Sequence, residues 1–154
     1  MSINQVLSNP IAGRFADRSG KSTAIVAGGT LTSLAVAIVP LVCSYGLVGE
    51  SVLDWSNWPM LATLSFWSLG GTLLATAHVA AVSDEVNDSS RSQAIALLRT
   101  SGDVGYLFGA ACAGISADLV GDVGLAMQAG GAVFLGATTW FGLKSAALNK
   151  LYKR

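Results

Sequence analysis

Long stretches without charge alternate with short charged segments along this chain. Residues 22–49 carry no charge, residues 55–83 contain only His78 as an ionisable group, and residues 123–143 are again uncharged. A helix needs about 20 apolar residues to cross the hydrocarbon core of a bilayer, and each of these stretches is long enough. Because a lipid-exposed backbone must satisfy its own hydrogen bonds, the pattern predicts membrane-spanning helices.

Residues 92–117 are expected to form a further span with a polar face. The segment is rich in alanine, glycine and leucine but carries Arg99 and Asp103, which lie four positions apart and therefore share a helix face. Charges at such depth must be paired or hydrated. Three roles remain open for them: an ion pair within the helix, a contact from Arg99 to Asp17, or a place along a hydrated path.

The composition agrees with a membrane protein. Hydrophobic residues make up 52% of the chain and charged residues 12%, whereas a soluble domain carries roughly 25% charged residues. A net charge of zero and the lack of a basic stripe argue against nucleic acid as a partner. Cys43 and Cys112 fall in separate predicted spans, and no catalytic triad, phosphate loop or zinc spacing is present. We therefore expect neither an enzyme nor a bound metal or cofactor.

The cations predict the orientation of the four spans. With this topology all nine cations fall on, or nearest to, one side of the membrane: Arg14, Arg18, Lys21, Arg91, Arg99, Lys144, Lys150, Lys153 and Arg154. The positive-inside rule makes that side cytoplasmic. The opposite segments, around residues 49–57 and 121–122, have acids but no cations, and Trp55 and Trp58 flank the outer end of the second span. We expect segment 13–21 and the carboxyl terminus to be cytoplasmic.

The amino terminus is too short and too polar to span the membrane, and it lacks the pattern of a signal peptide. Pro10 and Gly13 are predicted to end a helix and to begin a loop. The expected organisation is therefore the end of a truncated helix at residues 1–12, a cytoplasmic loop at 13–21, and a four-span region with a short cytoplasmic tail at 22–154.

Residues 13–21, GRFADRSGK, resemble the signature loop of the major facilitator superfamily. That loop reads Gly, three residues, Asp-Arg, one residue, Gly, then Arg or Lys. Phe15 replaces the usual leucine. Residues 91–109 look like the penultimate helix of the family, with Arg91, Arg99, Asp103-x-Gly105 and then Gly109. Ala110 stands where many members have proline.

The resemblance implies an all-α membrane protein in which four transmembrane helices and an amino-terminal helix stub form part of a half-bundle. Such transporters have twelve helices in two halves. Helices two to six or eight to twelve both fit. We favour eight to twelve, because the Arg…Arg…Asp-x-Gly helix is commoner in the second half and a basic tail follows the last span.

The implied function is that of a fragment of a secondary active transporter that moves a small solute by alternating access. The substrate is unknown; the partners would be the lipid bilayer, the remaining helices of a longer transporter and, with His78 or Asp103 as candidate relays, protons. The alternative is a free-standing four-span membrane protein with an assembly or interaction role.

Within this resemblance, the signature loop would hold helices in one access state. Its gating residues would be Gly13, Asp17, Arg18, Gly20 and Lys21. Asp17 is suited to accept hydrogen bonds from a helix amino terminus. Lys21 is equally well explained as a plain basic flank of the first span.

Three further features have simpler interpretations. Gly105 and Gly109 predict close contact between helices. His78 is a candidate proton relay, although a hydrogen-bonded structural histidine is the simpler interpretation. The acidic segment with Asp84, Glu85 and Asp88 is expected to be a solvated loop.

Overall fold

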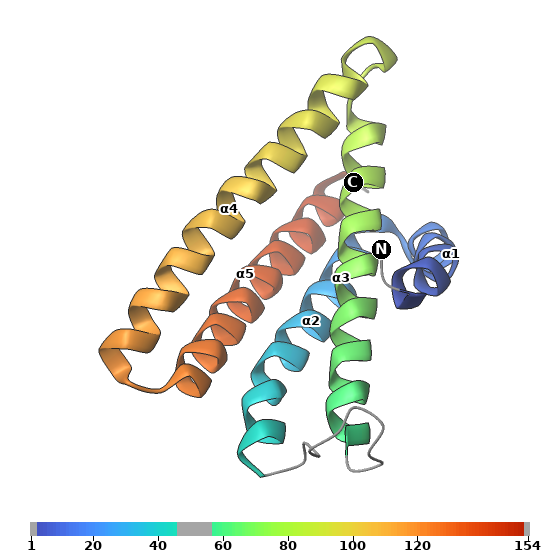
Figure 1. Ribbon diagram of the computed structural model, residues 1–154. Coiled ribbons are helices and arrows are strands. Elements are labelled where there is room, and N and C mark those ends of the chain that lie inside the picture. The colour runs from blue at the N-terminus through green and yellow to red at the C-terminus, as the bar shows by residue number, and fades with distance from the viewer. Residues whose placement is uncertain (1–2, 46–56, 153–154) are drawn as a thin grey trace.

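The computed structural model describes residues 3–45 and 57–152, and these ranges are almost entirely helical (Figure 1). The elements are α1 (Ile3–Ser19), α2 (Lys21–Ser44), α3 (Trp58–Glu85), the short 3-10 helix η2 (Asp88–Ser90), α4 (Arg91–Val120) and α5 (Val123–Tyr152). The all-α fold class expected from the sequence is confirmed.

Helices α2 to α5 run alternately up and down, and α1 crosses α3 steeply (Figure 1). Helix α2 packs against both α3 and α5, and within the described ranges α3 and α5 make no substantial contact with each other. Helix α4 contacts α5 and α3 less extensively. The structure is therefore organised around α2.

Within the described ranges, three helical segments are long and apolar enough to cross a membrane: Lys21–Ser44, Trp58–Glu85 and Asp88–Val120. They correspond to the first three predicted spans. Helix α5, with 30 residues, is as long as α4, and its crossing of the membrane stays a prediction. The segment with Glu50, Asp54 and Trp55, which is predicted to be on the outer side, falls in a range that the structure does not describe.

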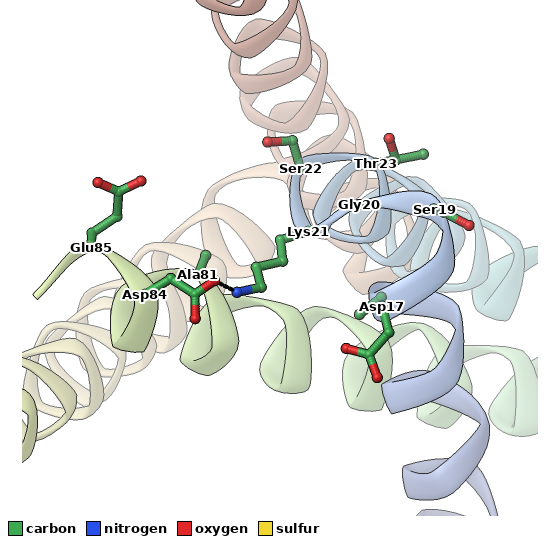
Figure 2. A pocket seen from close by; sticks show the side chains of 10 residues that line it. Asp17, Ser19, Gly20, Lys21, Ser22, Thr23, Ala81, Asp84 and Glu85 are labelled. Carbon is green, nitrogen blue, oxygen red and sulfur yellow. Dashed lines mark ion pairs between the residues drawn. The ribbon is translucent and has the colours of Figure 1, made fainter.

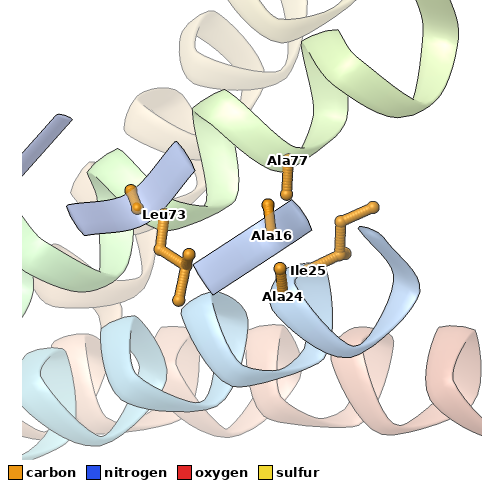
Figure 3. Close-up of a cluster of buried hydrophobic side chains, with 6 residues drawn as sticks. Ala16, Ala24, Ile25, Leu73 and Ala77 are labelled. Atoms are coloured by element: carbon orange, nitrogen blue, oxygen red, sulfur yellow. The ribbon is translucent and has the colours of Figure 1, made fainter. Parts of the chain in front are cut away.

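The predicted end of the first helix is wrong. Helix α1 continues through Pro10 and Gly13 as far as Ser19, although proline removes a backbone hydrogen bond from a helix interior. The helical register brings Ala12 and Ala16, four positions apart, onto one face, where both are buried. Figure 3 shows Ala16 within this buried cluster. Packing of this face offsets the cost of the proline. Residues 13–19 are therefore helix, not loop.

Gly20 alone separates α1 from α2. Its φ of 85° and ψ of 145° lie in a region that is essentially restricted to glycine. The chain turns here in one residue, and α2 starts at Lys21. The predicted nine-residue loop is therefore reduced to a single glycine break.

Two glycines bring α2 and α3 into backbone contact. A Cβ atom on Gly28 would lie 2.8 Å from the nitrogen of Leu74 and 2.9 Å from the carbonyl oxygen of Gly70. A Cβ atom on Gly70 would lie 2.8 Å from the nitrogen of Thr32. Small residues permit such close approach between membrane helices, where van der Waals packing replaces the hydrophobic effect.

The contact between α2 and α5 is built in the same way. A Cβ atom on Gly29 would meet the side chain of Thr138, and one on Gly131 would lie 3.1 Å from the carbonyl oxygen of Ser33. The hydroxyl of Ser33 donates to the carbonyl of Gly29 at 2.7 Å, so this buried polar group is satisfied within α2.

Helix α4 has no buried residue. It ends at Gly121, which adopts the left-handed conformation with a φ of 70°. Asp122 then caps α5, because its Oδ1 accepts hydrogen bonds from the backbone amides of Gly124 at 2.7 Å and Leu125 at 3.1 Å. A tight turn thus joins two long helices.

Candidate functional site

A cavity of 590 Å³ opens where α1, α2 and the end of α3 meet (Figure 2). Its lining combines small, hydroxyl and charged side chains: Ala16, Asp17, Ser19, Gly20, Lys21, Ser22, Thr23, Ala81, Asp84 and Glu85. The glycine break at Gly20 positions this site, because it turns the chain so that the first residues of α2 face the last turn of α3.

Lys21 forms an ion pair with Asp84, drawn as a dashed line in Figure 2. Its Nζ also donates a hydrogen bond to the carbonyl oxygen of Ala80 at 3.2 Å. The side chain of Lys21 is 29% exposed and that of Asp84 is 66% exposed. The contact therefore ties the start of α2 to the end of α3 at the surface of the bundle.

The local electrostatics favour this pairing. A cation at the first position of a helix faces the positive end of the helix dipole. The carboxylate of Asp84 neutralises Lys21 and also brings negative charge to that helix end. An exposed ion pair contributes about 0.2–1 kcal/mol, so its effect is on the relative position of two helices more than on overall stability.

The sequence interpretation missed Asp84 as the partner of Lys21. Asp84 and Glu85 belong to the last turn of α3, not to a solvated loop, and that expectation is wrong. Only Asp88 of the acidic segment lies in the connection, where its Oδ1 pairs with Arg91 at 2.8 Å. No local signal identifies Asp84, since Asp84 and Lys21 lie far apart in the sequence.

Other signature residues lie around the cavity without closing it. Asp17 lines the cavity, and its carboxylate points away from the Lys21–Asp84 pair (Figure 2). Within the described residues, Asp17 makes neither an ion pair nor a hydrogen bond to the amino end of α2. Gly13 lies in α1, and Arg18 is exposed near the end of that helix.

The candidate residues on α3 and α4 lie apart from this site. Arg99 and Asp103 are exposed on α4, and in the described part of the chain they pair neither with each other nor with Asp17. A Cβ atom on Gly105 or Gly109 would meet no neighbouring atom of the described residues within 4 Å. The predicted close contact therefore does not form within this part of the chain. His78 is half-buried in α3.

A family model described as Major Facilitator Superfamily matches residues 1–151. The chain belongs to the major facilitator superfamily. No curated protein and no solved structure matches it. The helical fold and the apolar helices agree with this membership, which makes the protein an integral, multi-pass membrane protein of a transporter family. Members of the major facilitator superfamily are transporters of small solutes, not enzymes.

The cavity lies at the segment that resembles the signature loop of the major facilitator superfamily. The segment GRFADRSGK spans the last turns of α1, the break at Gly20 and the first residue of α2. The structure brings Asp17, Gly20 and Lys21 together at one cavity and adds Asp84 to them.

Proposed function

We propose that the chain supplies helices eight to twelve of a twelve-helix secondary transporter that moves a small solute by alternating access. The support is the order of the elements, in which the shorter helix α1, which ends in the signature segment, is followed by four long helices. The choice of helices eight to twelve rests on the pattern Arg91, Arg99 and Asp103-x-Gly105 in α4. Transport in this class arises from rocking of two halves around a site near the middle of the bilayer. The substrate site would be completed by the other half.

In this proposal the Lys21–Asp84 ion pair favours one access state. The single observation that carries the idea is that this pair bridges α2 and α3 beside the Gly20 break. An interaction of up to about 1 kcal/mol that exists in only one of two states shifts their ratio roughly fivefold. That is sufficient to bias a conformational equilibrium without locking it.

A charge exchange tests the role of the pair. In a background without Cys43 and Cys112, a cysteine at Ser22, which lines the cavity and is partly buried, reports on the cavity through its rate of maleimide labelling. Lys21→Gln or Asp84→Asn should raise that rate, and the exchange Lys21→Asp with Asp84→Lys should restore it, because the attraction is restored with opposite polarity.

The matched control is Arg91→Gln, which removes the ion pair with Asp88 at 2.8 Å and should leave labelling at residue 22 unchanged. If the exchanged variant labels as fast as the single variants, the ion pair does not hold the site closed.

The proposal also assigns a topology, with segment 13–21 and the carboxyl terminus in the cytoplasm. It is supported by the grouping of the cations. In whole cells, a membrane-impermeant maleimide should label a cysteine at Val123, beside the α4–α5 turn, and should not label one at Ser89 in η2. Permeabilised cells provide the control for reactivity. Labelling of both positions in intact cells would contradict this topology.

The proposal predicts that this chain alone does not transport a solute. The purified 154-residue chain should insert into liposomes without solute flux, because the other half of the proposed path is absent. Robust uptake by this chain alone would contradict the proposal. A reading frame that continues upstream through seven or eight further apolar spans would support it, whereas a stop codon just before Met1 would favour a free-standing four-span assembly protein.

A further inference from the structure

The outer face of α1 combines two cations with two large apolar side chains. Ile11, Arg14, Phe15 and Arg18 follow one another at spacings of three, one and three positions, which places them on a single helix face. Ile11 is 62% exposed and Phe15 is 40% exposed. Another face of α1 carries Ala12 and Ala16, which are buried against the bundle. We call the four exposed residues the α1 stripe.

The cations of the α1 stripe have no acidic partner among the described residues. Lys21 is paired with Asp84 and Arg91 with Asp88, and these are the ion pairs found in the described ranges. Arg14 and Arg18 lie one helical turn apart and are both exposed. Within the described part of the chain, this face therefore carries two guanidinium groups that no carboxylate pairs with.

The neighbouring helices place the stripe near a membrane boundary. The apolar helix α2 starts two residues after Ser19, which ends α1. The start of α2 and the later part of α5 share a cavity lined by Ser22, Thr23, Val26, Gly142, Ser145 and Ala146. At that level of α5, the Nζ of Lys144 lies 5.1 Å from the ring centroid of Trp140. Tryptophan and lysine together are typical of the interface between lipid and water.

We propose that the α1 stripe is a binding surface for the headgroups of anionic phospholipids. Guanidinium groups bind phosphate oxygens through paired, charge-assisted hydrogen bonds. Ile11 and Phe15 lie on the same face and suit the upper part of the acyl chains. The charge complementarity identifies an anionic membrane lipid as the partner. The inference goes beyond the proposed function and does not depend on whether the chain takes part in transport.

The test uses the whole chain in phosphatidylcholine nanodiscs that contain a photoactivatable phosphatidylglycerol. Crosslinks should map to the peptide around the α1 stripe. Arg14→Gln with Arg18→Gln should lower crosslinking there roughly fivefold for each arginine, the fold-change that corresponds to about 1 kcal/mol per cation near an anionic surface. Arg14→Lys with Arg18→Lys should retain only part of it, because the charge is kept while the paired hydrogen bonds of the guanidinium groups are lost.

A matched control removes two cations from α4 with Arg91→Gln and Arg99→Gln, which changes the net charge equally. This variant should leave crosslinking at α1 intact. Unlabelled phosphatidylglycerol should compete with the probe, and inorganic phosphate should not, which separates a lipid from a free anion. Circular dichroism of each variant confirms that the helices are retained.

Three results would overturn the proposal. The first is equal loss of α1 crosslinking in the α1 and α4 variants, which would indicate a bulk charge effect. The second is competition by inorganic phosphate. The third is efficient formation of disulfide-linked dimers by Ile11→Cys in a background without Cys43 and Cys112, which would show that a second copy covers the stripe.

Discussion

Replacement of Gly70 by alanine tests the closeness of α2 and α3. The new Cβ atom would lie 2.8 Å from the nitrogen of Thr32 and 3.0 Å from the carbonyl oxygen of Gly28. Ordinary contacts of this kind start at 3.4 Å, so the helices must move apart by about 0.5 Å. These two atoms belong to the backbone of α2, so rotation of the Thr32 side chain, whose Oγ1 would lie 2.6 Å from the new Cβ atom, relieves only part of the clash.

The expected cost follows from this displacement. Insertion of an extra carbon into a well-packed contact costs about 1–3 kcal/mol. Alanine in place of glycine in a helix also gains up to about 1 kcal/mol of intrinsic propensity. A Cβ atom on Gly71, the next residue in α3, would meet no neighbouring atom within 4 Å. Gly71→Ala therefore carries the same gain without the clash, and it should exceed Gly70→Ala in stability by about 1–3 kcal/mol.

Steric trapping in bicelles measures the free energy of unfolding for each variant without removing the lipid. We expect Gly70→Ala to be the less stable of the two and Gly71→Ala to equal or exceed the parent chain. Equal stability of the two alanine variants would refute the reasoning, because it would mean that the backbones of α2 and α3 are not in contact at Gly70.

Two further predictions concern the ends of helices. Gly20→Ala should destabilise the chain by about 1–3 kcal/mol, because alanine is strained at a φ of 85°. The control, Gly13→Ala within α1, should be neutral or stabilising. Thermal unfolding in detergent compares the stability of the two variants. Asp122→Ala should cost about 1 kcal/mol of stability, because the cap on the amides of Gly124 and Leu125 is lost, whereas Asp122→Asn should retain most of the stability. The measurement is amide hydrogen exchange at the start of α5, which should be faster in Asp122→Ala. Unchanged exchange would contradict the capping role.

The helices could be predicted from the sequence because hydropathy reports directly on the solvent around a segment. Uncharged residues 22–49 contain most of α2, and residues 55–83 contain most of α3. Lipid requires an internally hydrogen-bonded backbone, so a long apolar segment has essentially one solution. The alternation of spans follows from the same constraint.

The break between α1 and α2 was misplaced because local propensity competes with packing. Pro10 and Gly13 are both poor residues for a helix interior, and they indicated an end there. The buried alanines at positions 12 and 16 need a continuous helix to reach α3, and this contact prevails. Only the positive φ of Gly20 then ends the helix.

The partners within the candidate site could not be predicted because they depend on how the helices pack. Hydropathy does not tell which face of a uniformly apolar helix meets a neighbour. The sequence therefore pointed to Gly105 and Gly109, whereas the close contact forms at Gly28 and Gly70. The pairing of Lys21 with Asp84 likewise depends on the tertiary arrangement of α2 and α3.

The exposure of α4 has a practical consequence for mutagenesis. None of its residues is buried against the rest of the chain, so most substitutions along it should leave the unfolding temperature almost unchanged. A change at a position of α4 away from its contacts with α3 and α5 that does alter the behaviour of the protein then reports on a neighbour outside these helices. Substitutions can therefore be scanned along α4 one position at a time, and the loss of an external contact is not confused there with damage to folding.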